Sequence, residues 1–251
     1  MTDLRPEARA LIGTAGWSLP RIHQPQFPAA GSHLERYSAV FPAVEINSSF
    51  YRPHRKVVYE RWAASTPEAF RFSVKAPKSI THSNAEPRVA ELDAFFSEIA
   101  GLGEKRGAVL VQLPPKRAFS AADSRALLGA FRDRTDADIV LEPRHASWFA
   151  PDADALLTEL GIARVAADPP RAAGADRPGG WTGLAYYRLH GSPDIYRSAY
   201  GRKRLEPLAD SLRATRAAGS QIWCILDNTT LSAATDDALY LLRALSGGDE
   251  R

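Results

Sequence analysis

Residues 108–113 read AVLVQL, a short apolar run in which Gln112 is the one polar residue and stands close to the end. A run that is apolar throughout is typical of a strand covered on both faces, as in a parallel sheet. The sequence therefore predicts that such runs are strands of a parallel sheet. Seven further short runs, most of them equally apolar, are 11–14, 43–46, 71–75, 138–141, 163–166, 185–189 and 221–226.

Helical patterns lie between these runs. Apolar residues recur there at steps of three and four, which predicts helices that pack on one side. Ser120 and Asp152 precede two of the patterns and are predicted N-caps, because their side chains can accept a hydrogen bond from the first helical turn. The patterns span 34–41, 89–102, 127–131, 156–160 and 238–245.

The spacing of the strand ends favours a closed barrel over an open sheet. The mean step between strand ends is about 31 residues, and eight such steps give about 250 residues, the usual size of a (β/α)₈ barrel. We therefore expect an α/β fold of the TIM type that forms a single domain over 1–251, with the barrel itself in about 10–246. The residues that mark the strand ends are Gly13, Glu45, Lys75, Gln112, Glu142, Asp168, His190 and Asp227.

One of the predicted units, each made of a strand and the helix that follows it, is shorter than the others. Only 22 residues separate Asp168 from His190, and this segment is rich in proline and glycine. Such residues are typical of loops, so the sixth helix is predicted to be missing or reduced. The following segment, GSPDIYRSAYGRKR at 191–204, is predicted to be a long polar loop on the ligand side.

Composition limits the class of protein. The 251 residues contain 32 Lys plus Arg against 29 Asp plus Glu, a net charge of +3 that suits an anionic ligand but is too small to indicate nucleic acid by itself. No apolar stretch approaches the roughly 20 residues of a membrane-spanning helix, so no membrane partner is expected. The start of the sequence lacks the pattern of a secretory signal. With a single cysteine, Cys224, the chain is predicted to be cytoplasmic.

Polar side chains gather at the predicted strand ends. Residues two apart on a strand point the same way, so Glu45 pairs with Asn47, Glu142 with Arg144, and Arg188 with His190. Each group alone could form a structural ion pair, but barrel enzymes draw their catalytic residues from several strand ends at the C-terminal mouth. The set as a whole therefore predicts a site. Neighbouring strand ends add Lys75, Gln112, Asp168, Asp227 and Asn228.

Aromatic residues and one further histidine follow the strands. Trp17, Tyr51, Trp148 and Tyr196 could stack on a sugar ring or a base, or could seal the top of the barrel. His82 follows the third strand close to two lysines, so its charge could be tuned by them. These residues complete the predicted ligand-binding set.

Seven short motifs occur in register with the strand ends, and together they resemble the domain-of-unknown-function 72 family, also called YecE-like, over nearly the whole chain. The resemblance implies a TIM-type barrel but supplies no activity. The first loop, LPRIHQPQFP at 19–28, departs from the family pattern, which has a second tryptophan and a phenylalanine-tyrosine-proline. The motifs are GTAGW at 13–17, EINSSFYRP at 45–53, RFSVKAPKSITH at 71–82, QLPP at 112–115, EPRHASWF at 142–149, YRLHG at 187–191 and LDNT at 226–229.

The leading hypothesis is an enzyme, a hydrolase or a lyase, that binds a phosphate-bearing molecule at the mouth. Arg144, Arg188 and Lys75 would hold the anion, because guanidinium groups grip oxyanions with paired hydrogen bonds. Glu142 or Glu45 would act as general base, and His190 as acid or proton carrier. No Walker loop, dinucleotide fingerprint, zinc-protease motif or nucleophile elbow is present, so no organic cofactor is indicated.

Three alternatives remain at this level. Carboxylates and a histidine at the mouth could hold a divalent metal in a phosphodiester hydrolase or nucleic-acid-binding protein, with Arg197 and the basic run 202–204 along the phosphate backbone. Two carboxylates and aromatic walls could serve a glycoside hydrolase. A non-catalytic protein that senses its ligand could keep the same pocket.

Overall fold

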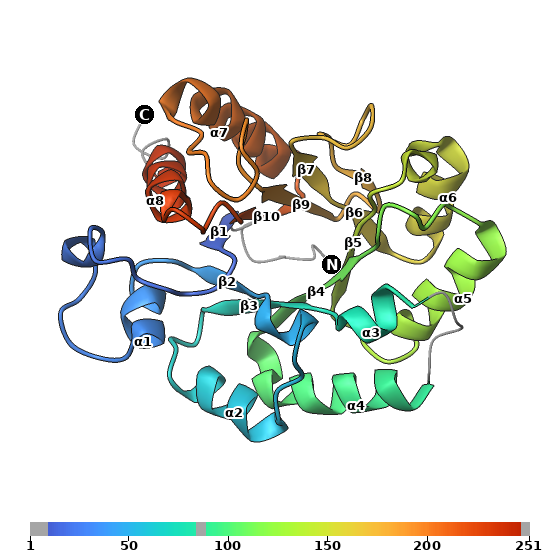
Figure 1. Cartoon of the computed structure of the whole chain (residues 1–251), viewed down its shortest axis with the longest axis horizontal. Coiled ribbons are helices and arrows are strands. Elements are labelled where there is room, and N and C mark those ends of the chain that lie inside the picture. Colours follow the sequence, from blue (N-terminus) through green and yellow to red (C-terminus); the bar gives the residue numbers. More distant parts are fainter. Residues whose placement is uncertain (1–9, 84–88, 247–251) are drawn as a thin grey trace, which may run out of the picture.

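The computed structural model describes residues 10–83 and 89–246, which form a mixed α/β fold with parallel sheets (Figure 1). Every strand pair is parallel except β6–β8, which is antiparallel. One sheet has the order β2 (Ala43–Ile46), β3 (Arg71–Lys75), β4 (Arg106–Gln112), β5 (Asp138–Glu142), β6 (Ile162–Arg164) and β8 (Gly179–Gly180). The other sheet has the order β1 (Ala10–Thr14), β10 (Gln221–Leu226), β9 (Leu184–Leu189) and β7 (Ala166–Asp168).

Helices surround the strands on the outside (Figure 1). None of those within the described ranges is long and apolar enough to cross a membrane. The α-helices are α1 (His33–Ser38), α2 (Lys56–Ala64), α3 (Lys78–Thr81), α4 (Val89–Ile99), α5 (Ala121–Arg132), α6 (Pro151–Glu159), α7 (Arg202–Ala217) and α8 (Ala233–Ser246). Short 3₁₀ turns are η1 (Gln24–Gln26), η2 (Ser48–Phe50), η3 (Ala100–Lys105) and η4 (Ala146–Phe149).

The predicted strands are found with small changes in their bounds, and one of them is divided. The run 163–166 falls into β6 and β7, because β6 pairs with β5 whereas β7 pairs with β9. Val165 lies between the two, and its amide donates to the Leu141 carbonyl at 2.9 Å. A change of partner sheet within one extended segment leaves no mark in hydrophobicity, so the sequence could not predict it.

Helix starts were predicted with mixed success. The Ser120 hydroxyl accepts from the Asp123 amide, as expected of an N-cap. Asp152 is not a cap, because α6 begins one residue earlier at Pro151, whose fixed φ suits the first helical position. The expected loop 191–204 is also shorter, since α7 begins at Arg202.

The segment between β7 and β9 contains no helix, in agreement with its short length. Residues 169–183, all of them described, contain the two-residue strand β8 and otherwise turns. Two glycines form β8, and its antiparallel pairing with β6 turns the chain back before β9. The segment 169–183 between β7 and β9 is therefore a loop, not a helix, and it follows the carboxyl end of β7.

The two sheets meet between β1 and β2. Ala15 forms an isolated parallel bridge with Glu45, and the Gly16 amide donates to the Glu45 carbonyl at 2.9 Å. Gly13 permits the approach, since a Cβ at this position would lie 2.1 Å from the Ala43 carbonyl oxygen. A close contact of backbones therefore joins the first strands of the two sheets.

Two apolar layers cover the two faces of the strands. An outer layer packs strand residues such as Ile12 and Val44 against the helices. An inner cluster combines Leu11 and Ile225 of one sheet with Val140 of the other. Both faces are thus buried, which explains the continuously apolar runs. Toward the carboxyl ends of the strands the inner positions become polar, and they form the site described next.

Candidate active site

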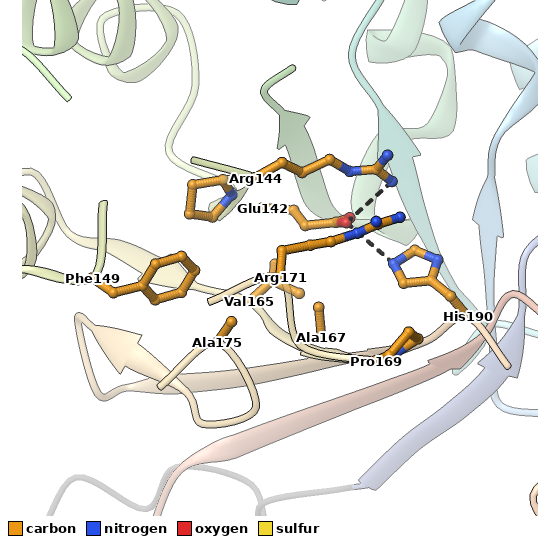
Figure 2. A pocket seen from close by; sticks show the side chains of 10 residues that line it. Glu142, Arg144, Phe149, Val165, Ala167, Pro169, Arg171, Ala175 and His190 are labelled. Atoms are coloured by element: carbon orange, nitrogen blue, oxygen red, sulfur yellow. Dashed lines mark hydrogen bonds and ion pairs between the residues drawn. The ribbon is translucent and has the colours of Figure 1, made fainter. Parts of the chain in front are cut away.

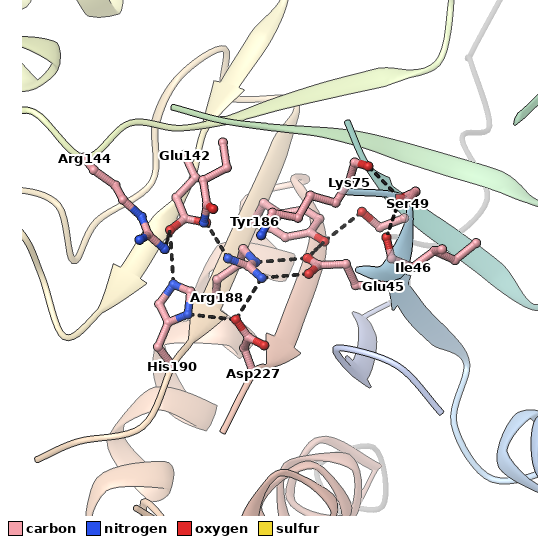
Figure 3. A network of polar contacts seen from close by, with 12 residues as sticks. Glu45, Ile46, Ser49, Lys75, Glu142, Arg144, Tyr186, Arg188, His190 and Asp227 are labelled. Atoms are coloured by element: carbon pink, nitrogen blue, oxygen red, sulfur yellow. Dashed lines mark hydrogen bonds and ion pairs between the residues drawn. The ribbon is translucent and has the colours of Figure 1, made fainter. Parts of the chain in front are cut away.

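Arg188 is the centre of a buried ionic network (Figure 3). Its side chain is fully buried at the end of β9. It forms a bidentate pair with Glu45, with nitrogen–oxygen distances of 2.7 and 3.0 Å, and it also bonds to Glu142 and to Asp227. Three carboxylates from β2, β5 and the residue after β10 are therefore held by one guanidinium group, whose planar donors suit several carboxylate partners.

A second chain of contacts runs through His190. Its Nε2 lies 3.1 Å from Glu142 Oε1, and its Nδ1 lies 3.0 Å from Asp227 Oδ2. Gln112 donates to Glu142 Oε2 at 2.8 Å. The imidazole is thus enclosed by two carboxylates, which favours its protonated form and fixes its orientation.

The pKa values of these groups shift in opposite directions. Burial by itself would raise the pKa of Glu142, but Arg188 and His190 hold it well below its usual range. For Asp227, burial is likewise outweighed by the same two cations, so its pKa is lowered. Burial would lower the pKa of His190, yet the two carboxylates raise it. The network therefore favours the ionised forms of Glu142 and Asp227 and the protonated form of His190.

These shifts predict how the stability of the protein depends on pH. A lowered carboxylate pKa contributes stability that is lost as the pH falls toward the folded-state value, whereas the raised pKa of His190 contributes stability that is lost as the pH rises through it. We expect the free energy of unfolding to fall on both sides of an intermediate optimum. Urea denaturation over a pH series measures it, and Asp227→Asn should lose stability less steeply in acid than the wild type. An equal acid slope in the two proteins would contradict the pKa assignment of Asp227.

Lys75 projects into the same network from the end of β3 (Figure 3). It is 5% exposed, and its Nζ lies 4.2 Å from the centre of the Phe50 ring. Among the described residues, no hydrogen-bond acceptor or carboxylate lies within bonding distance of Nζ. Burial and the nearby charge of Arg188 lower the pKa of Lys75 to about 8. A part of the population therefore carries a neutral amine near physiological pH.

A rim of cationic side chains surrounds the opening above the network. Burial lowers the pKa of His82, and the charges of Lys78, Lys75, Arg144 and Arg117 lower it further. Among the described residues, Arg144 contacts one carboxylate, that of Glu142 at 3.5 Å, and its buried Nε has no hydrogen-bond partner. Among the described residues, the three carboxylates below face Arg188, His190 and Lys75, and the charged groups that act on His82 at the rim are cations.

A small pocket opens beside Glu142 (Figure 2). Glu142, Arg144 and His190 line one side of it, and the apolar residues Phe149 and Val165 line the other. Arg171, from the loop after β7, reaches over the same pocket. The pocket thus places an acid–base pair next to two guanidinium groups.

The structure separates the predicted site residues by depth. Glu45 and Arg188 are fully buried and bond to each other, and Glu45 also accepts from the Tyr186 hydroxyl. The polar atoms of Arg188 and Glu45 thus bond to each other and to their neighbours below the opening. Glu142, Arg144 and His190 lie at the opening.

Two of the predicted ligand-binding residues are buried and make structural contacts. Trp148 is 1% exposed and donates to the Arg117 carbonyl, so it offers no surface for stacking. Asn228 is fully buried and donates to Asp237 and to the Ser198 carbonyl, which anchors the start of α8. The packing that buries Trp148 depends on the tertiary fold, so its position after a strand could not show that the side chain is covered.

The remaining aromatic candidates differ in their surroundings. The Tyr196 ring packs edge-on against His190, with ring centres 5.8 Å apart. Tyr51 is largely exposed and contacts Phe50. Trp17 packs edge-on against Trp62 at 4.9 Å, which places it over α2. Asn47, half-buried after β2, has a buried Oδ1 without a partner.

Sequence reasoning missed four residues of the site. Tyr186 and Ser73 hydrogen-bond to each other at 2.8 Å inside the network, and each stands two positions before a predicted site residue on its strand. The alternation of side chains could have revealed both. Arg171 and Arg117 lie in loops, where no sequence periodicity indicates direction. One residue of the basic run 202–204 already has a partner within the protein, since Arg204 forms an ion pair with Asp168 at 3.1 Å.

The carboxylates of the network are arranged around cations. Within the described part of the chain, no group of three histidine, cysteine, aspartate or glutamate side chains has an arrangement that could hold a metal ion. The oxygens of Glu45, Glu142 and Asp227 accept instead from Arg188. This donor set suits ion pairing within the protein.

Comparison with known proteins places the chain in a family. It is 32% identical to the UPF0759 protein YunF of Bacillus subtilis over 147 residues, which cover 56% of this chain and 52% of YunF. It is 32% identical to the UPF0759 protein YecE of Escherichia coli K12 over 98 residues, 38% of this chain and 36% of YecE. The match therefore spans about half the length of the first relative and about a third of the second.

Solved structures are similar over almost the whole chain. A DUF72 family protein of Enterococcus faecalis superposes with a TM-score of 0.81 at 21% identity, covering 95% of this chain and 96% of its own. A DUF72 family protein of Thermotoga maritima gives a TM-score of 0.77 at 22% identity, covering 95% and 100%. These likenesses concern the fold. The model of the family described as "Protein of unknown function DUF72" matches residues 11–251, and the chain belongs to that family.

Proposed function

We propose that the two sheets form one closed TIM-type (β/α)₈ barrel in a single domain, and that its C-terminal mouth is an enzyme site for a small phosphate-bearing molecule. The strand order, the bridge between Ala15 and Glu45 and the passage of β6 into β7 support a closed ring. The inner apolar cluster draws on both sheets, as the filled interior of a barrel would. The polar network then lies at the face where enzymes of this fold carry their sites.

The cluster of cations at the rim is the observation that carries the proposal. Burial lowers the pKa of His82, and among the described residues the charges that lower it further belong to Lys78, Lys75, Arg144 and Arg117. A phosphate group would supply negative charge there, and guanidinium groups bind it through paired hydrogen bonds. Arg144 and Arg171 line the pocket from which such contacts would be made.

The acid–base chemistry rests on Glu142 and His190. Glu142 borders the pocket, and its Oε1 lies 3.1 Å from the imidazole Nε2. His190 can deliver a proton to this carboxylate or accept one from it, while Asp227 stabilises the positive charge on the ring. Glu142 would then exchange the proton with the bound ligand, as a general acid or base does.

Arg144→Ala is expected to weaken the binding of phosphate esters. A hydrogen bond to a charged group contributes about 1.5–3 kcal/mol, which corresponds to a loss of about 10- to 150-fold in affinity. Isothermal titration calorimetry with inorganic phosphate and with glycerol phosphate measures the change. Arg125→Ala is the matched control, because Arg125 is half-exposed and pairs with Glu159 on the surface.

Two results would count against the anion site. Equal phosphate affinity in Arg144→Ala and the wild type would exclude Arg144 from the site. No phosphate binding by the wild type at low ionic strength, where electrostatic attraction is strongest, would refute the site as a whole.

A further inference from the structure

Lysine is rare in this chain, and one lysine differs from the rest. The sequence has 26 arginines and six lysines. Lys56 lies 3.9 Å from Glu60, and the Lys105 ammonium donates to two backbone carbonyls at 2.6 Å. Lys78, Lys116 and Lys203 are exposed. Lys75 is buried at the mouth with no acceptor among the residues that the structure describes, in a chain that otherwise relies on arginine for positive charge.

The surroundings of Lys75 fit a reactive amine. An arginine cannot lose its proton in a protein, whereas a lysine in a desolvated site can. Burial and Arg188 lower the pKa of Lys75 to about 8, so the neutral nucleophile is available. The backbone at this position is fixed, since the Ser49 hydroxyl donates to the Lys75 carbonyl at 2.6 Å. The amine thus points into the network from a rigid strand end.

We propose that Lys75 is a nucleophile that forms an imine with the carbonyl group of a phosphate-bearing aldehyde or ketone. This inference rests on the proposed phosphate site and adds the class of substrate. The amine nitrogen attacks the carbonyl carbon to give a carbinolamine. A carbon–nitrogen double bond then replaces the carbon–oxygen double bond, and the oxygen leaves as water with both hydrogens of the neutral amine. No oxidant or reductant is needed.

The rest of the site suits such an intermediate. The rim cations around His82 would hold the phosphate, so the carbonyl end of the molecule would extend toward the strand ends. A protonated imine is itself a cation, and the Phe50 ring face, 4.2 Å from Nζ, favours a cation there. Glu142 and His190 belong to the same network and would relay a proton from the attacking amine to the departing oxygen.

Trapping with borohydride tests the proposal on the full chain. Pyridoxal 5′-phosphate, an aldehyde that carries phosphate, is mixed with the protein, the imine is reduced, and the modified lysine is located by peptide mass spectrometry. We expect Lys75 to be the main modified residue, with a rate that rises with pH through about 8. Inorganic phosphate should slow the reaction. Modification of the exposed lysines with Lys75 unmodified would overturn the proposal.

Variants separate this inference from the proposed function. Lys75→Arg and Lys75→Met should lose the main adduct, while Lys116→Arg should retain it, because Lys116 is exposed on the loop after β4. Circular dichroism checks that each variant is folded. Phosphate binding by calorimetry without an adduct at Lys75 would refute the imine and leave the anion site standing. Labelling of Lys75 by pyridoxal, which lacks phosphate, at the same rate would refute the phosphate-bearing class.

Discussion

Arg188→Leu is expected to lower the free energy of unfolding by about 3–5 kcal/mol, the range found when one partner of a buried ion pair is removed. The substitution would leave Glu45, Glu142 and Asp227 without their shared counter-charge in the interior. A buried carboxylate that loses its cation must either protonate or admit water, and both cost free energy. Urea denaturation at neutral pH measures the change.

The pH dependence separates this electrostatic effect from lost packing. The deficit of Arg188→Leu should shrink as the pH falls, because protonated carboxyl groups no longer need a counter-charge. Arg125→Leu is the control, since its surface pair with Glu159 is expected to contribute less than about 1 kcal/mol. A loss of less than about 1 kcal/mol in Arg188→Leu would contradict the buried network.

Glu142→Gln is expected to lower kcat by about 100- to 10,000-fold, the usual contribution of general acid–base catalysis. The amide keeps the shape of the side chain but can neither take a proton from the ligand nor hold the charge of His190. The measurement is turnover of the phosphate ester that a screen of such compounds identifies. Circular dichroism and phosphate binding should show that the variant remains folded and still binds the anion.

The matched control for Glu142→Gln is Glu159→Gln, a change of the same chemistry at an exposed pair. Its kcat should equal that of the wild type. Full activity in Glu142→Gln would remove Glu142 from the mechanism. Equal losses in the two variants would show that the effect does not come from the site.

The sequence predicted the strands well because a strand that is buried on both faces is a continuously apolar run. The runs 43–46, 71–75 and 221–226 coincide with β2, β3 and β10. The absence of a helix after β7 followed from the short, proline-rich segment, since a helix and two loops do not fit there. The Asp152 cap was wrong because the preference of Pro151 for the first turn outweighed that of the acidic side chain.

The alternation of side chains also predicted which residues face inward, but it did not predict how far below the opening each side chain lies. Residues two apart on a strand differ by nearly 7 Å along the strand axis. This rise separates Arg188, which is fully buried among carboxylates, from His190 beside the pocket. The packing of neighbouring strands decides which of these inward-facing side chains is buried and which is accessible. The sequence can therefore predict that an arginine points inward, but not whether it is accessible to a ligand.

By itself the amino-acid sequence determined eight apolar runs that lie in strands, five helical patterns, the short segment between β7 and β9 and the collection of charged residues at the strand ends, because these follow from local hydrophobicity and spacing. Tertiary structure alone decided that Glu45 and Arg188 neutralise each other, that Trp148 is buried and that Arg171 reaches the pocket. The physical reason is distance along the chain. Glu45 and Arg188 are 143 residues apart, and an ion pair between them exists only after the strands that carry them have come together.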